Sequence, residues 1–242
     1  MTFGGWPVIL QRWRRRAERF LRRPGFATAP SGPRPERLEV DKWAMSETVL
    51  KLIRIVGTHP YPLDELLLMA AAFAYHRPEV VIDIGTHVGK SARIWHELSR
   101  ELGTKTSIHT IDLCDASHPE FPAEQLGRYV RGLPVTQHVG DGVAVATGLI
   151  ERAPSAVYLI FCDGDHRRES VARELELATA VRRGCLLVHD TFYQPGSTYN
   201  HGPYEAMNEF ISRVPVRQVL HLQTGLPGLS YLGLSSGGAD PP

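Results

Sequence analysis

Acidic residues and histidines cluster at the ends of short apolar segments in this sequence. Five aspartates follow or end such segments, and two histidines lie beside the last two of them: Asp83, Asp112, Asp141, Asp163, Asp190, His166 and His189. If the segments are strands of a parallel sheet, their carboxyl ends border the region where ligands bind. Converging carboxylates share a proton or bind a cation, and a histidine exchanges a proton near neutral pH. The pattern predicts a cleft that binds a charged ligand and transfers a proton.

The turn after the first apolar segment is rich in glycine. It reads Asp83-Ile84-Gly85-Thr86-His87-Val88-Gly89-Lys90-Ser91 and precedes an amphipathic segment. Glycine lets the backbone turn tightly and approach a ligand, and the helix that follows presents free N–H groups. Three kinds of ligand use such a turn: the phosphates of a P-loop nucleotide, a dinucleotide, and S-adenosylmethionine (SAM).

The spacing of the glycines in the turn distinguishes between these three ligands. A P-loop requires glycine at position 84, which is isoleucine here, and a dinucleotide site requires G-x-G-x-x-G where the chain has G-x-x-x-G. Asp112 is placed to accept the two ribose hydroxyls of a nucleoside, and Asp141 is placed to accept from an adenine amino group. SAM is therefore favoured, while a nucleotide hydrolase using Gly89-Lys90-Ser91 and a purely structural turn stay as alternatives.

Asp163 and Asp190 end the fourth and fifth strand-like segments. Neighbouring strands lie about 5 Å apart, so the two carboxylates should face one space. His189 can add a third ligand for a divalent cation, and His166 stands three positions after Asp163. A metal ion that coordinates a hydroxyl eases loss of its proton, which a histidine can accept. This group of residues predicts a site that activates a hydroxyl.

These residues require a framework of alternating strands and helices. Apolar, β-branched runs predict strands buried on both faces, and helical periodicity marks the segments between them. Strands are expected over 80–84, 107–111, 135–139, 156–162, 185–188, 216–222 and 229–234. Helices are expected over 36–56, 62–75, 89–102, 121–131, 143–152, 169–181 and 203–212. The alternation predicts an α/β fold with a Rossmann-like, doubly wound sheet of seven strands, mostly parallel with an antiparallel edge strand.

The segment Val81–Ala92 resembles the first motif of class I SAM-dependent methyltransferases. Residues 108–112 and 140–141 are similar to the adenosine-binding motifs that follow, and the resemblance extends over roughly residues 62–234. Many members have a glycine at the position of His87. The resemblance implies SAM as the cofactor, contacted by Asp83, Gly85, Thr86, His87, Gly89, Ser91, Asp112, Asp141 and Asp163.

The two segments that contain Asp163 and Asp190 resemble motifs of one methyltransferase branch. That branch includes rhamnosyl and macrolide-sugar O-methyltransferases and cephalosporin hydroxylase-like proteins. In its metal-dependent members, the position of Asp163 is a metal ligand and that of His166 supplies the general base. Paired acidic or amide ligands stand in the branch where this chain has His189 and Asp190. The resemblance implies a divalent cation, with Mg²⁺ favoured, at these three ligand positions and His166 as the catalytic base.

Charge is unevenly distributed along the chain. The net charge is +1, but residues 1–37 contain nine arginines and two glutamates, which gives +7, whereas the remainder has 18 basic and 24 acidic residues, which gives −6. The near-neutral total argues against a nucleic-acid binder. The pattern of residues 6–23 predicts an arginine-rich amphipathic helix. We expect this helix to dock on the protein or to form a dimer contact, in preference to peripheral contact with a membrane. Residues 24–35 predict a linker.

Composition excludes several other classes. No apolar run is long enough to span a membrane, and the N-terminus does not resemble a secretory signal. Three separated cysteines, Cys114, Cys162 and Cys185, fit no disulfide framework. We expect a cytoplasmic homo-oligomer. We expect a basic arm over residues 1–37 and helices that cover the acceptor side over 38–76. A SAM-binding catalytic domain over 77–234 and a tail over 235–242 are expected to follow.

The leading hypothesis is a SAM-dependent O-methyltransferase that acts on a hydroxyl of a small molecule. A sugar or glycoside of a specialised metabolite is the favoured acceptor and a phenol comes second, which would place the enzyme in natural product biosynthesis. The alternatives are the nucleotide hydrolase and a non-catalytic protein of the same fold that binds a partner.

Overall fold

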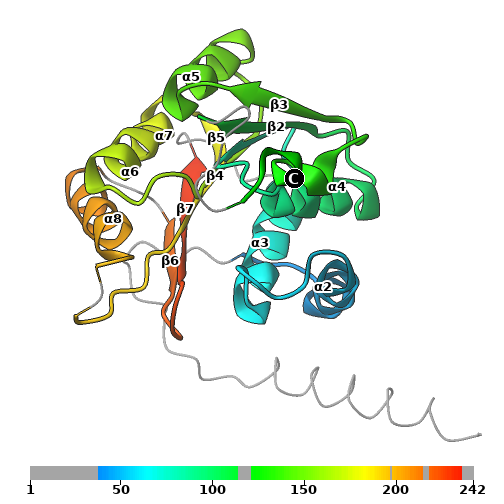
Figure 1. The fold of residues 1–242 in the computed structure, drawn as a ribbon, viewed down its shortest axis with the longest axis horizontal. Coiled ribbons are helices and arrows are strands. Elements are labelled where there is room, and N and C mark those ends of the chain that lie inside the picture. Colours follow the sequence, from blue (N-terminus) through cyan, green and yellow to red (C-terminus); the bar gives the residue numbers. More distant parts are fainter. Residues whose placement is uncertain (1–37, 114–120, 197, 215–217, 236–242) are drawn as a thin grey trace, which may run out of the picture. The chain divides into compact units, whose positions relative to one another are not determined.

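A computed structural model describes the chain except for residues 1–37, 114–120, 197, 215–217 and 236–242. Seven strands form one sheet in the order β3-β2-β1-β4-β5-β7-β6 (Figure 1). Their bounds are Val80–Ile84 (β1), Ser107–Asp112 (β2), Val135–Val139 (β3), Tyr158–Cys162 (β4), Arg183–His189 (β5), Gln218–Leu222 (β6) and Leu229–Ser235 (β7). The seven-stranded Rossmann-like sheet predicted from the sequence is confirmed.

The parallel strands are in a register that brings their carboxyl ends together. Ile84 at the end of β1 pairs with Ile111 of β2 on one side and Cys162 of β4 on the other. The pairing of β1 with β4 continues past the ends of both strands, where Asp163 N–H donates to the carbonyl of Ile84 over 3.0 Å. As a result, the segments that follow these strands all open onto one edge of the sheet.

The two last strands form an antiparallel pair at one side of the sheet. β7 runs antiparallel to both β5 and β6, and it lies between them. The predicted antiparallel strand is therefore β7, while the outermost strand β6 has the direction of the parallel strands. This arrangement brings the turn before β7 next to the end of β5, since Thr191 N–H donates to the carbonyl of Gly228 over 3.2 Å.

Helices cover both faces of the sheet (Figure 1). One face packs against Lys42–Val56 (α2), Leu63–His76 (α3) and Lys90–Glu101 (α4). The other packs against Gly142–Arg152 (α5), Arg168–Leu175 (α6), Leu177–Ala180 (α7) and His201–Arg213 (α8). Consecutive residues of a strand point to opposite faces of the sheet, so Val81 packs in the same core as α2, α3 and α4, and Ile82 packs in the core on the other face. This is why β1 has no polar alternation.

Several predicted bounds differ from the structure for local reasons. The helix expected over 121–131 is wrong: two 3₁₀ turns, Ala123–Gln125 (η1) and Arg128–Val130 (η2), replace it, because Gly127 between them has φ +60°. The helix expected from residue 36 begins at Lys42, where the Asp41 carboxylate accepts from the N–H groups of Trp43 and Ala44. The helix expected over 169–181 is divided into α6 and α7.

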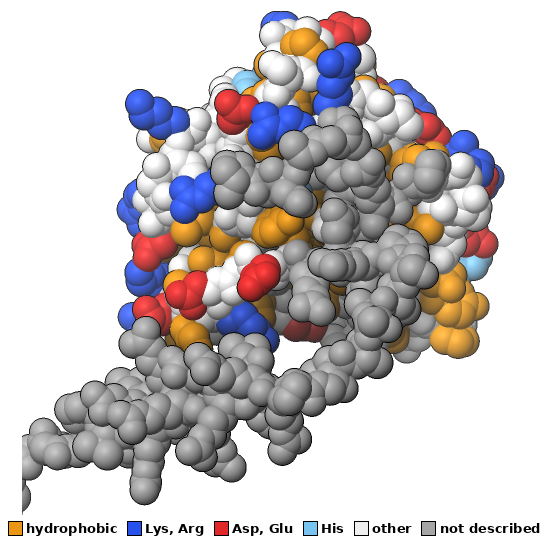
Figure 2. Space-filling view, turned by 180° about the vertical axis from the view of Figure 1, so that it is seen from behind, with side chains coloured by type: hydrophobic (Ala, Val, Ile, Leu, Met, Phe, Trp, Pro, Cys, Tyr) orange, Lys and Arg blue, Asp and Glu red, His pale blue; other side chains and the backbone are white. Residues whose placement is uncertain are grey.

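Other predictions fall outside the described residues. These are the arginine-rich helix over 6–23, the linker over 24–35 and all of the predicted tail except Ser235, which ends β7. In the part that is described, no helix combines the length and the apolar character needed to cross a membrane. On the face shown in Figure 2, hydrophobic side chains are visible toward the middle, and basic and acidic side chains lie mostly around the rim.

Candidate active site

A cavity of about 1290 Å³ lies at the carboxyl ends of the parallel strands. It is larger than the range of about 300–1,000 Å³ common for small-molecule sites, which leaves room for two ligands together. Most of the predicted site residues line it: Gly85, Thr86, His87, Ser91, Asp112, Asp141, Asp163, His166, His189 and Asp190. The structure therefore brings together side chains from five strand ends, and only Asp83 and Gly89 of the predicted set do not line the cavity.

Asp83 lies beneath the cavity and not on its wall. Its carboxylate is fully buried and accepts hydrogen bonds from Ser91 Oγ (3.0 Å), Trp95 Nε1 (3.1 Å) and Thr110 Oγ1 (2.8 Å). Burial raises its pKa to about 7, and the three hydrogen bonds limit the rise. Thr110 Oγ1 in turn pairs with Thr86 Oγ1 at 2.7 Å, so Asp83 holds the glycine turn from below.

The two glycines of the turn have backbone shapes that other residues rarely adopt. Gly85 has φ +101°, and a Cβ there would lie 2.1 Å from the main-chain oxygen of Asp163. Gly89 has φ +86° and packs against Gly127 and Val130. His87 between them also has positive φ, +47°, which explains why many methyltransferases have glycine at this position. The turn is thus packed tightly against β4 and η2.

Two carboxylates follow β2 and β3 at the same end of the cavity. Asp112 accepts from the backbone N–H of His87 at 2.9 Å, which fixes it above the glycine turn. Asp141 is the N-cap of α5 and accepts from Ala144 N–H at 2.9 Å. Both oxygens of Asp141 also accept from Arg173 at 3.1 Å. The backbone hydrogen bond and the arginine lower the pKa of Asp141, which is therefore an ionised, already paired group.

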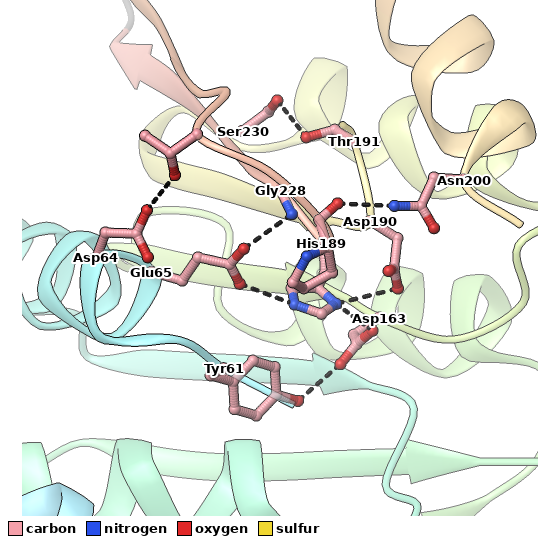
Figure 3. A network of polar contacts seen from close by, with 12 residues as sticks. Tyr61, Asp64, Glu65, Asp163, His189, Asp190, Thr191, Asn200, Gly228 and Ser230 are labelled. Carbon is pink, nitrogen blue, oxygen red and sulfur yellow. Dashed lines mark hydrogen bonds and ion pairs between the residues drawn. The ribbon is translucent and has the colours of Figure 1, made fainter. Parts of the chain in front are cut away.

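At the other end of the cavity, His189 forms the centre of a network drawn from three parts of the fold (Figure 3). Its Nδ1 lies 3.0 Å from Asp163 Oδ1 and 3.1 Å from Asp190 Oδ2. Its Nε2 lies 3.0 Å from Glu65 Oε2, on α3. The surrounding carboxylates outweigh burial and raise the pKa of His189 well above its usual value. Tyr61 completes the network, since its hydroxyl donates to Asp163 Oδ2 at 2.6 Å.

His166 approaches the same network from the cavity side. Its Nε2 lies 3.0 Å from Asp190 Oδ2, and its ring contacts Tyr199 edge-on at 4.6 Å between centroids. The side chain is 27% exposed, whereas that of Asp190 is 4% exposed. Burial opposes ionisation of Asp190, but the hydrogen bonds from His166 and His189 lower its pKa to about 2. The ionised Asp190 in turn raises the pKa of His166 against the effect of burial.

The donor set of Asp163, His189 and Asp190 fits a divalent cation. One ligand atom from each lies within 4.8 Å of the others. Two carboxylates and one imidazole are common metal ligands, and a carboxylate on the far ring nitrogen, here Glu65, is the usual outer partner of a metal-bound histidine. The chemistry of the residues is thus compatible with a bound divalent cation.

The sequence-based prediction assigned no role to Tyr61, Glu65 and Asn200, which all lie in or beside the network. Glu65 is 2% exposed, and a signal for it was present: it shares a helical stripe with the buried residues at positions 68, 69 and 72. A carboxylate on a buried stripe needs a partner inside the protein. Asn200 donates from Nδ2 to the carbonyl of Pro227 at 2.8 Å, which no sequence pattern indicates.

Nothing in the described residues supports nucleotide hydrolysis. The lysine of the supposed P-loop, Lys90, donates to the main-chain oxygen of His59 at 2.5 Å and lies 5.6 Å from the centroid of the Tyr129 ring. It therefore fastens the segment before α3 to the start of α4 and does not point into a phosphate cradle.

Comparisons with known proteins agree with this architecture. Residues 82–191 match a family described as a methyltransferase domain. No curated protein sequence matches the chain. Among solved structures, the chain is similar to the SAM-bound O-methyltransferase TomG from Streptomyces achromogenes, involved in tomaymycin synthesis, with 18% identity, a TM-score of 0.55 and coverage of 82% of this chain and 92% of that one.

Two further structures show the same fold. Cofactor-bound Rv0187 from MTB has 17% identity and a TM-score of 0.51 over 85% of each chain. An O-methyltransferase from Bacillus cereus in complex with SAH has 18% identity and a TM-score of 0.50, over 81% of this chain and 92% of that one. Taken with the strand order, these findings confirm the predicted resemblance: residues 82–191 match a methyltransferase domain, and the chain has the fold of class I SAM-dependent methyltransferases.

Proposed function

We propose that this enzyme transfers the methyl group of SAM to a hydroxyl of a small molecule. The observation that carries the proposal is a single cavity with two differently built ends. We call the end lined by residues 85–88 and 90–91, Asp112 and Asp141 the cofactor half. The end lined by Asp163, His166, His189 and Asp190 is the catalytic half.

In the cofactor half, the glycine turn would contact the methionine part of SAM and Asp112 its ribose hydroxyls. An acidic residue after the second strand is the usual partner of a ribose in sheets of this kind. Asp83 would act through the turn that it supports, since its oxygens are engaged below the cavity. Asp141 would border the adenine site as an ion pair with Arg173.

In the catalytic half, His166 would be the general base. Its Nε2 is held by Asp190, and among the described residues its Nδ1 has no hydrogen-bond partner. The acceptor oxygen would attack the methyl carbon of SAM as the carbon–sulfur bond breaks, giving the methyl ether and S-adenosylhomocysteine (SAH). The proton of the hydroxyl would pass to His166 Nδ1. Asp190 would keep the ring oriented and stabilise its protonated form.

A divalent cation, with Mg²⁺ the ion favoured by the family resemblance, would be held by Asp163, His189 and Asp190. When bound, such an ion lowers the pKa of a coordinated hydroxyl. Tyr61 donates to the Asp163 oxygen that His189 does not contact, so it orients this carboxylate. Thorough chelation should therefore slow methyl transfer, and unchanged activity in a strong chelator would remove the metal from the proposal.

The acceptor is proposed to be a sugar or glycoside of a specialised metabolite, with a phenol as the second choice. The size of the cavity supports a bulky acceptor beside the cofactor. The similarity in fold to an enzyme of tomaymycin synthesis is compatible with such a role. The N-terminal helices would cover the acceptor, since α3 and the segment before it supply Glu65 and Tyr61 to this half.

The test is a methyl-transfer assay with SAM labelled in the methyl group. We expect label in the ether product of at least one sugar or phenolic acceptor, together with an equal amount of SAH. Label on nitrogen or carbon of the products of a broad acceptor panel, and never on oxygen, would contradict the proposal.

A further inference from the structure

The two ring nitrogens of His189 face different kinds of surroundings. The side chain is 3% exposed, so water does not compete for either nitrogen. Nε2 meets a single oxygen, that of Glu65 on α3, whereas Nδ1 meets two oxygens, from Asp163 and Asp190, at the cavity wall (Figure 3). The nitrogen that can bind a cation therefore depends on which of the two must donate a hydrogen bond to its neighbour.

Glu65 decides this for Nε2. Its Oε1 accepts the backbone N–H of Gly228 at 2.8 Å, and the carboxylate is buried, so Oε2 is left to interact with His189. An ionised carboxylate only accepts hydrogen bonds, so Nε2 must donate. Nδ1 is then the nitrogen that faces Asp163 and Asp190, and a cation bound between these two carboxylates would take the place of its proton.

The spacing around Nδ1 suits such a cation. Nδ1 lies 3.0 Å from Asp163 Oδ1 and 3.1 Å from Asp190 Oδ2. Adjacent corners of an octahedron are about 3.0 Å apart when each ligand is about 2.1 Å from the metal. The donor set differs from the all-oxygen sets that Mg²⁺ prefers, because imidazole nitrogen suits transition metals.

We propose that Glu65 is a positioning residue that directs Nδ1 of His189 toward Asp163 and Asp190, and that the resulting site prefers a divalent transition metal to Mg²⁺. This inference rests on the proposed function, because it concerns the metal proposed for the same site. It replaces Mg²⁺ with an ion such as Mn²⁺ or Co²⁺, for which a ring nitrogen is a good ligand.

The first test uses the unmodified protein. Mn²⁺ is added in the presence of SAH, and pulsed electron paramagnetic resonance measures coupling between the ion and nearby nitrogen nuclei. We expect the coupling of a directly bound imidazole. Bound Mn²⁺ without nitrogen coupling, or no binding of Mn²⁺ at all, would overturn the inference.

The second test compares variants by calorimetric titration with Co²⁺ and Mg²⁺. Changing His189→Asn replaces nitrogen by oxygen and should reduce the ratio of Co²⁺ to Mg²⁺ affinity at least tenfold. Changing Glu65→Gln should weaken Co²⁺ binding by about 10–100-fold, the effect usual for loss of such an outer partner. The matched control is Asp64→Asn, which alters an exposed contact to Thr224 in the same helical turn and should leave metal affinity unchanged.

Binding of SAH, measured on the same samples, separates the possible failures. If SAH binds and the affinity ratio is the same in wild type and His189→Asn, the metal inference is wrong and the proposed methyl transfer is unaffected. If SAH does not bind to folded wild-type protein, the proposed function itself is wrong. Should Glu65→Gln fail to fold, the nitrogen coupling in wild type and the His189→Asn ratio still decide the inference.

Discussion

The cofactor half and the catalytic half of the cavity are stabilised over very different distances along the chain. In the cofactor half, Asp83 is held by Ser91 and Trp95, eight and twelve positions away, within one strand–turn–helix unit. In the catalytic half, His189 is held by Glu65, 124 positions away on a helix of the opposite layer. The other hydrogen bonds of this half also join residues that are nearer along the chain, up to the 32 positions between Asp141 and Arg173. The geometry of the catalytic half depends on α3 packing against the sheet.

The largest effect is expected for a change that lowers the rate of methyl transfer without weakening cofactor binding. Changing His166→Ala removes the proposed base at the cavity wall and should reduce the rate of methyl transfer by about 10²–10⁴-fold, the usual contribution of general base catalysis. Affinity for SAH should stay within about twofold, because the described contacts of His166 are with Asp190 and Tyr199, which lie outside the cofactor half. Steady-state kinetics and calorimetry measure the two effects.

The exposed His201, at the start of α8, provides the control for this experiment. His201→Ala should leave both the rate and SAH affinity unchanged. If His166→Ala loses SAH affinity in proportion to its rate, the histidine belongs to the cofactor half and the division of the cavity is wrong.

The next effect concerns Glu174, a buried residue of α6 that lines the cavity. Its Oε2 has no hydrogen-bond partner among the described residues, and burial raises its pKa to about 8 from an ordinary value near 4.5. A raised carboxyl pKa stabilises the fold below the ordinary value, and this stability is lost as pH rises toward 8. Changing Glu174→Gln should therefore make the free energy of unfolding less dependent on pH.

The difference in free energy of unfolding between wild type and Glu174→Gln is expected to change by as much as about 4 kcal/mol between pH 5 and 8. The wild type becomes less stable relative to the variant as pH rises. Urea unfolding at several pH values measures it. Glu169→Gln, on the exposed face of the same helix, is the control. Parallel pH curves for wild type and Glu174→Gln would show that Glu174 is ionised throughout and would refute the account of this residue.

A third change tests whether Asp83 supports the turn or contacts the cofactor. In Asp83→Asn, the amide cannot accept all three hydrogen bonds, so at least one buried donor loses its partner. We expect a loss of about 1–3 kcal/mol in the free energy of unfolding, with weaker SAH binding as a consequence of the loosened turn. Loss of SAH affinity at unchanged stability would instead indicate direct contact with the cofactor.

The smallest effect is expected for the ion pair between Asp141 and Arg173. Both side chains are largely exposed, so removing the arginine in Arg173→Ala should cost less than about 1 kcal/mol. Removing the helix cap in Asp141→Ala should cost about 0.5–2 kcal/mol, because Ala144 N–H loses its acceptor. Thermal unfolding of the two variants ranks them, and a larger loss for Arg173→Ala would show that the pair matters more than the cap.

The same contrast explains how much could be predicted from the sequence. The parallel strands and the cofactor turn were predictable, because burial on both faces and the shape of a glycine turn leave local patterns. β1 and β3 have the predicted bounds, and the turn from Gly85 to Ser91 lies where the motif indicates. The helix predicted over 121–131 is wrong because a glycine at 127, with positive φ, separates two short 3₁₀ turns.

The catalytic half was only partly predictable. Asp163, His166 and Asp190 follow strands and could be found, but their partners come from distant segments. Tyr61 precedes α3, and Gly228 precedes β7, and neither has a sequence signal that points to Glu65 or Asp163. Such contacts are decided by how α3 and the β6–β7 pair pack beside β5, which no single-sequence pattern specifies.

The most direct test of the central claim is calorimetric titration of the full chain with SAH, followed by the same titration with Asp112→Ala. The account predicts one binding site per chain and an affinity about 10–100-fold lower in the variant, because the ribose loses its carboxylate. Folded wild-type protein that binds neither SAH nor SAM would contradict the account.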